Sequence, residues 1–384
     1  MKKICFVTGS RAEYGIMRRL LTRLDQDEDI QLDLVVTAMH LEEKYGYTLT
    51  DIERDGFTIT KKIYLQLTDT SKATIAHSLA TLTDGLIDVF SSEQYDLVII
   101  LGDRYEMLPV ANVALIFTVP ICHIHGGEKT LGNFDESIRH AITKMSHLHL
   151  TSTEEFRKRV IQLGESPQRV KHIGSMGVEN VLLQDFLSKE ELSCLLNIEL
   201  EENYYVVLFH PVTLENQTAV SQTEALVEAL KKTGTQCIVI GSNSDTSSDA
   251  IMQVLHSFVE ENVSCHLFSS LPTQYFHSLV KHSKGLLGNS SSGLIEVPSL
   301  RVPTLNIGNR QLGRVSGPSV CHVGTRTADI VSGLDALEKI SDFTNPYEKA
   351  DSSFLAYSAI KEFLTAGDVV MKDFYDLKCD EEII

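Results

Sequence analysis

Residues 96–128 read DLVIILGDRYEMLPVANVALIFTVPICHIHGGE, and this stretch decides the fold class. The apolar runs at 96–101 and 119–124 are typical of buried strands, and the apolar segment that separates them is typical of a helix. A strand, a helix and a second strand in about 30 residues predict a βαβ unit with parallel strands. Polar residues follow each strand directly, first GDRYE and then HGGE.

The same alternation of short apolar runs and helical segments continues on both sides of this stretch. The further runs that predict strands are KICFVT (3–8), LDLVVT (32–37), HLHLTS (147–152), YYVVLF (204–209), QCIVIG (236–241), CHLF (265–268), GLLG (285–288) and PTLNIG (303–308). Strands separated by helices predict an α/β fold with parallel sheets that are covered on both faces. The pattern begins again after about residue 200, so it predicts two doubly wound domains.

We place the N-terminal domain at residues 1–172 and the C-terminal domain at 173–365. The segment 366–384 is expected to pack back on the N-terminal domain. Two such domains predict a cleft, and ligands of open α/β sheets bind beyond the carboxyl ends of the strands. Charged or glycine-rich residues directly after each strand are therefore the candidates for a site.

Composition excludes several classes of protein. The chain has 384 residues, of which 43% are hydrophobic and 22% charged, as in globular proteins of two domains. The formal net charge of -18 argues against general binding to nucleic acid or to anionic membranes. The start, MKKICFVTGS, resembles a first strand and not a signal peptide. Seven cysteines without a CxxC pair predict reduced thiols and a cytoplasmic protein.

Four ionisable residues follow successive strands of the first half. They are Asp103, His125, Glu128 and Asp135. Carboxylates that gather at one edge of a sheet repel one another, and partial burial shifts their pKa values apart. This pattern indicates acid–base chemistry near neutral pH. Asp103 by itself also fits a helix N-cap.

The histidines allow a second interpretation. His123 and His125 alternate along one strand and His147 and His149 along another, and the spacing HxH could serve zinc. No third ligand follows at a recognisable spacing, so we favour strand histidines that bond to backbone acceptors. The acidic run DQDED at 25–29 is interpreted as a solvated turn. We expect no metal and no cofactor.

The second half holds the stretch GLLGNSSSGLIEVPSL, in which a strand runs into residues 288–293 and a helix begins. The hydroxyls of Ser290 and Ser291, together with the positive end of the helix, could hold a diphosphate. Glu296 lies about one turn further, within reach of a ribose diol. Arg310 could add positive charge. A serine-rich N-cap would explain one or two of these residues but not the whole set.

Two further residues stand at strand ends. Arg11 follows the first strand in TGSRAEYG, where a helix begins, and it fits an anion site and an ordinary surface arginine equally well. His210 comes directly after the strand YYVVLF.

Taken together, GSRAEYG, LGDRYE, HIHGGE, FDESIRHAITKMSHLHL, FHPVT, GNSSSGLIEVPSL and NIGNRQLGR resemble the hydrolysing UDP-N-acetylglucosamine 2-epimerases of bacterial sialic-acid synthesis. The resemblance covers most of the chain. It implies two Rossmann-like domains in the GT-B arrangement, a C-terminal helix that crosses back to the first domain, a homodimer and no metal.

Matched by motif, Arg11, Ser290, Ser291, Glu296 and Arg310 would bind UDP. Asp103, His125 and Asp135 would move protons at the sugar, and His210 would assist the departing diphosphate. Most relatives read HIEGGE where this chain has HIHGGE, and the following loop is one residue longer. Either His125 replaces the usual glutamate or Glu128 does. We favour His125, because a neutral imidazole can act as acid or base at pH 7.

The implied reaction converts UDP-N-acetylglucosamine and water to N-acetylmannosamine and UDP, by elimination to a glycal and hydration. The same motifs would fit a UDP-2,4-diacetamido-trideoxyhexose. A GT-B glycosyltransferase that uses a UDP-sugar is a further alternative, although it has no evident need for Asp103 and Asp135. A non-hydrolysing epimerase, a non-catalytic nucleotide-sugar sensor and a zinc hydrolase complete the alternatives.

Overall fold

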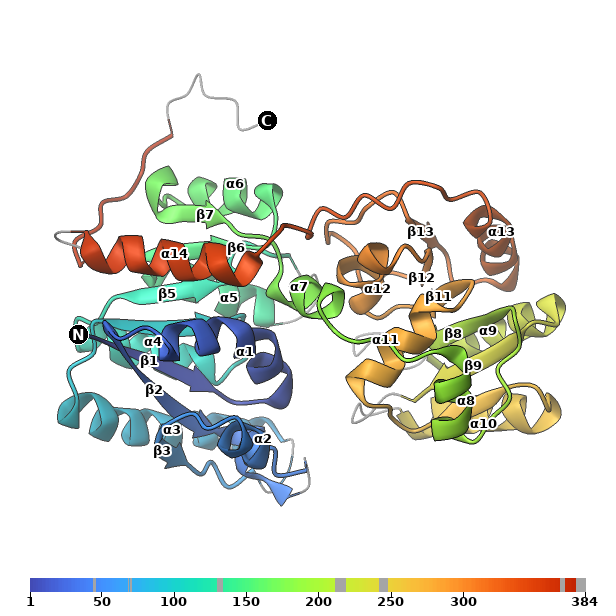
Figure 1. Cartoon of the computed structure of the whole chain (residues 1–384), viewed down its shortest axis with the longest axis horizontal. Coiled ribbons are helices and arrows are strands. Elements are labelled where there is room, and N and C mark those ends of the chain that lie inside the picture. Colours follow the sequence, from blue (N-terminus) through green and yellow to red (C-terminus); the bar gives the residue numbers. More distant parts are fainter. Residues whose placement is uncertain are drawn as a thin grey trace. The chain divides into compact units, whose positions relative to one another are not determined.

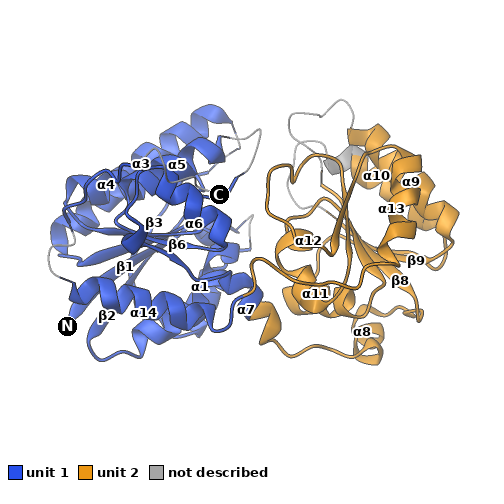
Figure 2. Ribbon diagram, turned by 90° about the horizontal axis from the view of Figure 1, so that it is seen from above, with its two compact units in different colours: residues 1–129, 133–179, 349–384 blue, residues 130–132, 180–348 orange. Residues whose placement is uncertain are grey.

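The computed structural model describes residues 1–43, 46–67, 69, 71–129, 134–210, 219–241, 248–366 and 370–377. The chain folds into two compact units (Figure 2). The described residues of 1–129, 134–179 and 349–377 form the first unit, and those of 180–348 form the second.

The first unit is built on a parallel sheet of seven strands in the order β3-β2-β1-β4-β5-β6-β7 (Figure 1). Its strands are β1 (Lys2–Thr8), β2 (Ile30–Thr37), β3 (Ile59–Ile63), β4 (Leu97–Leu101), β5 (Ile121–Ile124), β6 (Leu148–Thr151) and β7 (Val170–His172). Its helices are α1 (Arg11–Asp25), α2 (Leu49–Arg54), α3 (Lys72–Ser92), α4 (Met107–Ile116), α5 (Asp135–Met145), α6 (Glu154–Gln162) and α14 (Ser352–Thr365), and α7 (Met176–Leu182) leads to the second unit.

Alternation along the strands divides the core of this unit into two apolar layers. In β4, Leu97 and Ile99 pack into the layer that holds α1 and α14, whereas Val98 and Ile100 pack into the layer that holds α3 and α4. All four side chains are fully buried. Because both faces are covered, the strands are nearly continuous apolar runs, as the sequence predicted.

The second unit repeats the architecture with a parallel sheet of six strands in the order β10-β9-β8-β11-β12-β13. Its strands are β8 (Tyr204–Leu208), β9 (Gln236–Ile240), β10 (His266–Phe268), β11 (Gly285–Gly288), β12 (Thr304–Ile307) and β13 (Val320–Val323). Its helices are α8 (Lys189–Leu196), α9 (Ala219–Thr233), α10 (Ser248–Glu261), α11 (Thr273–Lys281), α12 (Ser292–Ile295) and α13 (Thr327–Leu337). The prediction of two doubly wound parallel sheets is confirmed.

The division between the units differs from the predicted one. Residues 173–179 and 349–365, which we placed in the C-terminal domain, belong to the first unit. The reason lies in α14, which packs along α1. The backbone N–H and hydroxyl of Ser353 donate to the buried carboxylate of Glu179 at 2.8 and 2.9 Å, and Arg23 donates to the same hydroxyl at 3.1 Å.

Candidate active site

The carboxyl ends of β4 and β5 in the first unit are joined by a buried arginine. Asp103 follows β4, and its carboxylate forms an ion pair with the guanidinium of Arg139 on α5. Only 3% of the Arg139 side chain is exposed. Its Nη1 donates to the carbonyl of Glu128 and to Oε2 of Glu136, each at 2.8 Å. Asp103 is thus held by a charge partner and is not a helix N-cap.

Asp135 is the first residue of α5, one turn before Arg139. Its pKa is raised to about 6, first by burial and then by the negative charge of Asp103, and Arg139 offsets part of this effect. The expectation of acid–base chemistry at this sheet edge fits the position of Asp135, because burial and the charge of Asp103 push its carboxyl toward neutrality. A group with a pKa near 6 can accept and return a proton at physiological pH.

His125 and Glu128 lie beside each other after β5, with Nδ1 of the imidazole 3.7 Å from Oε1 of the carboxylate. Ser152 donates its hydroxyl to the same Oε1 at 2.8 Å. The other ring nitrogen, Nε2 of His125, is buried and has no hydrogen-bond partner among the described residues. The backbone of His125 is in the left-handed region at φ +64°, and its N–H donates to Leu150 at 2.9 Å. Glu128 is therefore already engaged, whereas His125 keeps one ring nitrogen for another contact.

Sequence reasoning missed a buried charge cluster at the same edge of the sheet. Oε2 of Glu13 accepts from the backbone N–H of Gly9 at 2.9 Å, and Oε1 lies 3.9 Å from Arg104. Arg104 also donates to the fully buried carboxylate of Glu106 at 2.7 Å. Burial, above all, raises the pKa of Glu13 to about 7. Glu13 and Arg104 stand inside GSRAEYG and LGDRYE, but nothing in their spacing showed that the two motifs meet.

Arg11 lies at the start of α1, directly after the N-cap Ser10. Its side chain is 68% exposed, and its Nε is 3.6 Å from Asp51. An exposed arginine at a helix N-terminus remains available to an anion.

Structural partners hold three of the paired histidines, His123 on β5, His147 directly before β6 and His149 on β6. Nε2 of His123 donates to the carbonyl of Gly102 at 2.8 Å, and His147 accepts from the backbone N–H of Ile121 at 3.2 Å. His149 bonds to a carboxylate, that of Glu165, at 3.0 Å. In the part of the chain that the structure describes, no three His, Cys, Asp or Glu side chains are placed to hold a metal ion.

In the second unit, an asparagine fixes the residue after β8. The side chain of Asn289 accepts from the backbone N–H of His210 at 2.7 Å and donates to its carbonyl at 2.9 Å. This approach requires Gly288, because a Cβ there would lie 1.9 Å from the carbonyl oxygen of Leu208. Burial and the charge of Arg310 lower the pKa of His210 to about 4, so its imidazole is neutral at pH 7.

The serine corner follows directly after Asn289. The hydroxyl of Ser290 lies 2.9 Å from that of Ser292, and Ser291 is the N-cap of α12. The expected helix does begin here, but α12 has only four residues, so Glu296 is its C-cap. The dipole of one turn is weaker than that of a full helix.

Two residues near this corner were not predicted. Gln311 is buried and donates to the carbonyl of Asn289 at 2.8 Å, beside Arg310, which donates to the same oxygen at 3.2 Å. His277 on α11 lies 3.3 Å from the carboxylate of Glu296, and its other ring nitrogen is 3.3 Å from the amide oxygen of Gln184. The contacts of Gln311 and His277 join residues 19 or more positions apart, so no local sequence pattern could show them.

Comparison with known proteins places these motifs in one family. The family model described as UDP-N-acetylglucosamine 2-epimerase matches residues 22–361. The chain belongs to the UDP-N-acetylglucosamine 2-epimerase family. This epimerase is 48% identical to the polysialic acid biosynthesis protein P7 of Escherichia coli, over 98% of each chain. It is 36% identical to the GDP/UDP-N,N'-diacetylbacillosamine 2-epimerase (hydrolyzing) of Campylobacter jejuni, over 91% of this chain and 88% of the relative.

The fold of the epimerase is that of solved family members. The UDP-GlcNAc 2-epimerase of Neisseria meningitidis, whose crystal structure contains UDP-GlcNAc, aligns with a TM-score of 0.80 over 94% of this chain and 100% of that chain at 18% identity. The expected GT-B-like fold of two Rossmann-like domains is confirmed. No helix in the described ranges has the length and apolar character needed to span a membrane.

Proposed function

We propose that this epimerase is a hydrolysing enzyme that converts UDP-N-acetylglucosamine and water to N-acetylmannosamine and UDP. The observation that carries the proposal is the arrangement of Asp103, Arg139 and Asp135. It provides one carboxylate paired with a buried guanidinium and a second whose pKa is raised to about 6. Removal of the proton on C2 of the sugar needs a base whose pKa is close to the working pH, as that of Asp135 is.

The first step is an elimination. A base removes the proton on C2 of the sugar, the electron pair forms the C1–C2 double bond, and the C1–O bond breaks with its electrons on UDP. We assign the base to Asp135, because a carboxylate with a pKa near 6 is ionised at pH 7 to 8 and is more basic than an ordinary aspartate. The products are a glycal and UDP.

The second step is a hydration. Water adds to C1 while a proton is delivered to C2 from the opposite face, which gives the manno configuration. We assign this part of the reaction to His125. Asp103 and Glu128 would supply negative charge around its ring. A neutral imidazole can take a proton from water at one nitrogen or donate one.

Departure of UDP places negative charge on the diphosphate. We propose that Ser290, Ser291 and Arg310 of the second unit bind the diphosphate and that Glu296 binds the ribose. The neutral His210 would donate a hydrogen bond to the leaving oxygen, and Arg11 would add a cation. Preorganised donors of this kind stabilise developing charge without a metal.

One observation favours hydrolysis over retention of UDP. The Campylobacter relative carries the word hydrolyzing in its name. The same Campylobacter relative supports a second candidate, the identical chemistry on a UDP-2,4-diacetamido-trideoxyhexose. The UDP-binding residues would be unchanged in that case.

The test is incubation of the purified protein with UDP-N-acetylglucosamine alone and, separately, with the diacetamido sugar nucleotide. We expect UDP and a free 2-epimerised sugar from one donor without any acceptor. An epimerised sugar still attached to UDP would identify a non-hydrolysing enzyme, and dependence on an acceptor would identify a glycosyltransferase. A cytoplasmic location and a homodimer remain predictions, which cell fractionation and light scattering can check.

A further inference from the structure

Helix α5 carries several side chains of the candidate site. Asp135 is at its N-terminus, Arg139 one turn later contacts Asp103, and Thr143 lies 3.1 Å from the ring of His123. The position of α5 along its own axis therefore sets where Asp135 and Arg139 lie. The other end of α5 is held by a segment more than 200 residues away in the sequence.

That segment is residues 370–377, which we name the C-terminal strap. Lys372 of the strap donates from its ammonium group to the carbonyls of Lys144 and Ser146, at 2.7 and 2.6 Å. Lys144 is in the last turn of α5, and Ser146 is its C-cap. Carbonyls at a helix C-terminus lack intrahelical donors, and a cation there also interacts favourably with the helix dipole.

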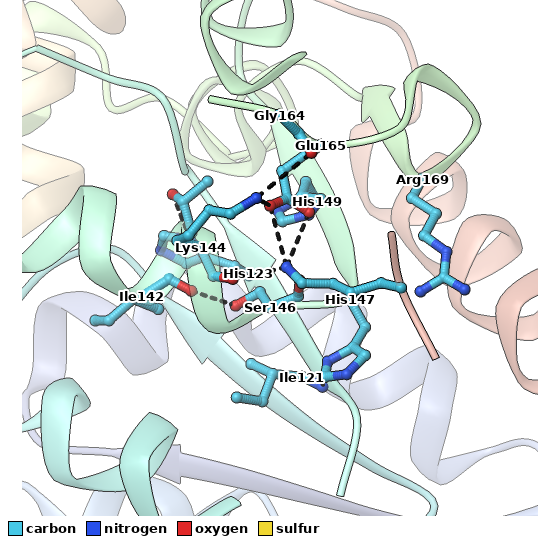
Figure 3. A network of polar contacts seen from close by, with 12 residues as sticks. Ile121, His123, Ile142, Lys144, Ser146, His147, His149, Gly164, Glu165 and Arg169 are labelled. Carbon is cyan, nitrogen blue, oxygen red and sulfur yellow. Dashed lines mark hydrogen bonds and ion pairs between the residues drawn. The ribbon is translucent and has the colours of Figure 1, made fainter. Parts of the chain in front are cut away.

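The same ammonium group fills a buried acidic site. Glu165 is only 2% exposed, and Lys372 lies 3.0 Å from each of its carboxylate oxygens. Glu165 also accepts from Lys144 at 2.6 Å and from His149 at 3.0 Å (Figure 3). Burial lowers the pKa of Lys372, so these partners must offset a desolvation cost.

Contacts on both sides of Lys372 fix the path of the strap. Arg169 donates to the carbonyl of Met371 at 2.7 Å, and the N–H of Tyr375 donates to the carbonyl of Gly164 at 2.9 Å. Gly164 has φ +86°, and a Cβ there would lie 2.4 Å from the ring of Phe374. These hydrogen bonds give the strap a defined position in the first unit, although it is distant in the sequence from the residues that it contacts.

A second series of contacts leads from Glu165 toward Asp103. His149 on β6 pairs in register with His123 on β5. His123 in turn donates to the carbonyl of Gly102, the residue before Asp103. Both histidines are fully buried, so a shift at Glu165 has little room to be absorbed before it reaches the end of β4.

We propose that Lys372 is a positioning residue: by capping α5 and binding Glu165, it sets the places of Asp135 and Arg139. The kinetic consequence rests on the proposed function, whereas the effect on α5 does not. A misplacement of about 1 Å in an active site can cost about 10²-fold in rate. Lys372 is not among the residues that we propose to bind UDP.

The experiment compares Lys372→Met with Lys361→Met in the full chain. Lys361 is a matched control, because it also binds two carboxylates of the first unit, Asp27 at 2.7 Å and Asp29 at 3.3 Å, but lies on α14. We expect Lys372→Met to lower kcat by about tenfold with the Kd for UDP unchanged. We also expect its pH–rate profile to shift, because the distance from Asp135 on α5 to Asp103 after β4 changes.

Amide hydrogen exchange of α5, with α4 as internal reference, tests the link to α5 without catalysis. Faster exchange in α5 is expected for Lys372→Met and not for Lys361→Met. Equal kcat, pH profile and α5 exchange in the two variants would overturn the proposal. If the parent protein turns over neither donor, the proposed function fails and the exchange result alone decides the role of Lys372. Should Lys372→Met not fold, Lys372→Arg keeps the charge and is expected to show the same changes to a smaller degree.

Discussion

The carboxylate of Asp103 is paired with Arg139, and its negative charge acts on the neighbouring carboxyl of Asp135. Asp103 forms an ion pair with the buried guanidinium of Arg139, and burial, followed by the negative charge of Asp103, raises the pKa of Asp135 to about 6. Two carboxylates in one site thereby receive separate roles from their surroundings.

The first prediction concerns Asp135. Asp135→Asn keeps the size of the side chain but removes the base, so turnover should fall by about 10² to 10⁴-fold. UDP binding should be retained, since the residues proposed to bind UDP lie elsewhere. Steady-state assays of UDP release and titration calorimetry with UDP measure the two quantities. Near-parental turnover in this variant would remove Asp135 from the mechanism.

The same residue gives a pH dependence. As a base, Asp135 must be ionised, so kcat/KM should fall as the pH drops through about 6, the raised pKa of this carboxyl. The residual kcat/KM of Asp135→Asn should not show this fall at low pH. A profile that instead rises below pH 6 would assign Asp135 as an acid in its protonated form.

A second prediction separates His125 from Glu128. The His125 ring has a buried Nε2 without a partner among the described residues, whereas Glu128 accepts from Ser152. His125→Gln should therefore lower kcat by about 10²-fold or more, and Glu128→Gln by less. Both variants are neutral amides, so each controls for the other. The reverse order would assign the role of the usual glutamate to Glu128.

The third prediction concerns stability and Glu13. Its folded pKa of about 7 lies above the ordinary value, so the protonated carboxyl stabilises the fold at low pH, and this contribution is lost as the pH rises through 7. Glu13→Gln does not titrate and can still accept from Gly9. Relative to the parent, it should gain about 1–3 kcal/mol in unfolding free energy between pH 5 and pH 8. Denaturant unfolding at both pH values measures this gain, and parallel curves would contradict it.

A fourth prediction concerns the ribose. His277 lies 3.3 Å from Glu296, so His277→Ala should free that carboxylate and weaken UDP binding by about tenfold. The loss should be smaller for 2′-deoxy-UDP, which lacks one of the two hydroxyls. His282→Ala, at the C-cap of the same helix, is the control. An equal loss for both nucleotides in His277→Ala would indicate a general structural effect.

The sequence predicted the fold better than the contacts in the site. Buried strands such as β4 were evident because both faces of a parallel sheet are covered. The strands β3, β7 and β13 were not predicted, since ITKKI carries two lysines and the short strands VKH and VCHV contain polar residues. Short or charged edge strands lack an apolar run.

Candidate residues were chosen directly after strands because ligands of open α/β sheets bind there. The contacts that these residues make were not predicted. Arg139 with Asp103, Asn289 with His210 and Lys372 with Glu165 are separated by 36, 79 and 207 positions. Periodicity and spacing report only on neighbours along the chain. The packing of the sheets brings these pairs together.

Proton NMR in heavy water with UDP-N-acetylglucosamine as the donor tests elimination followed by hydrolysis most directly. We predict free N-acetylmannosamine that carries deuterium at C2, because the original proton leaves in the first step and solvent supplies its replacement. UDP should appear in equal amount. A product that keeps its original C2 proton, or an epimerised sugar that stays attached to UDP, would contradict the proposed chemistry.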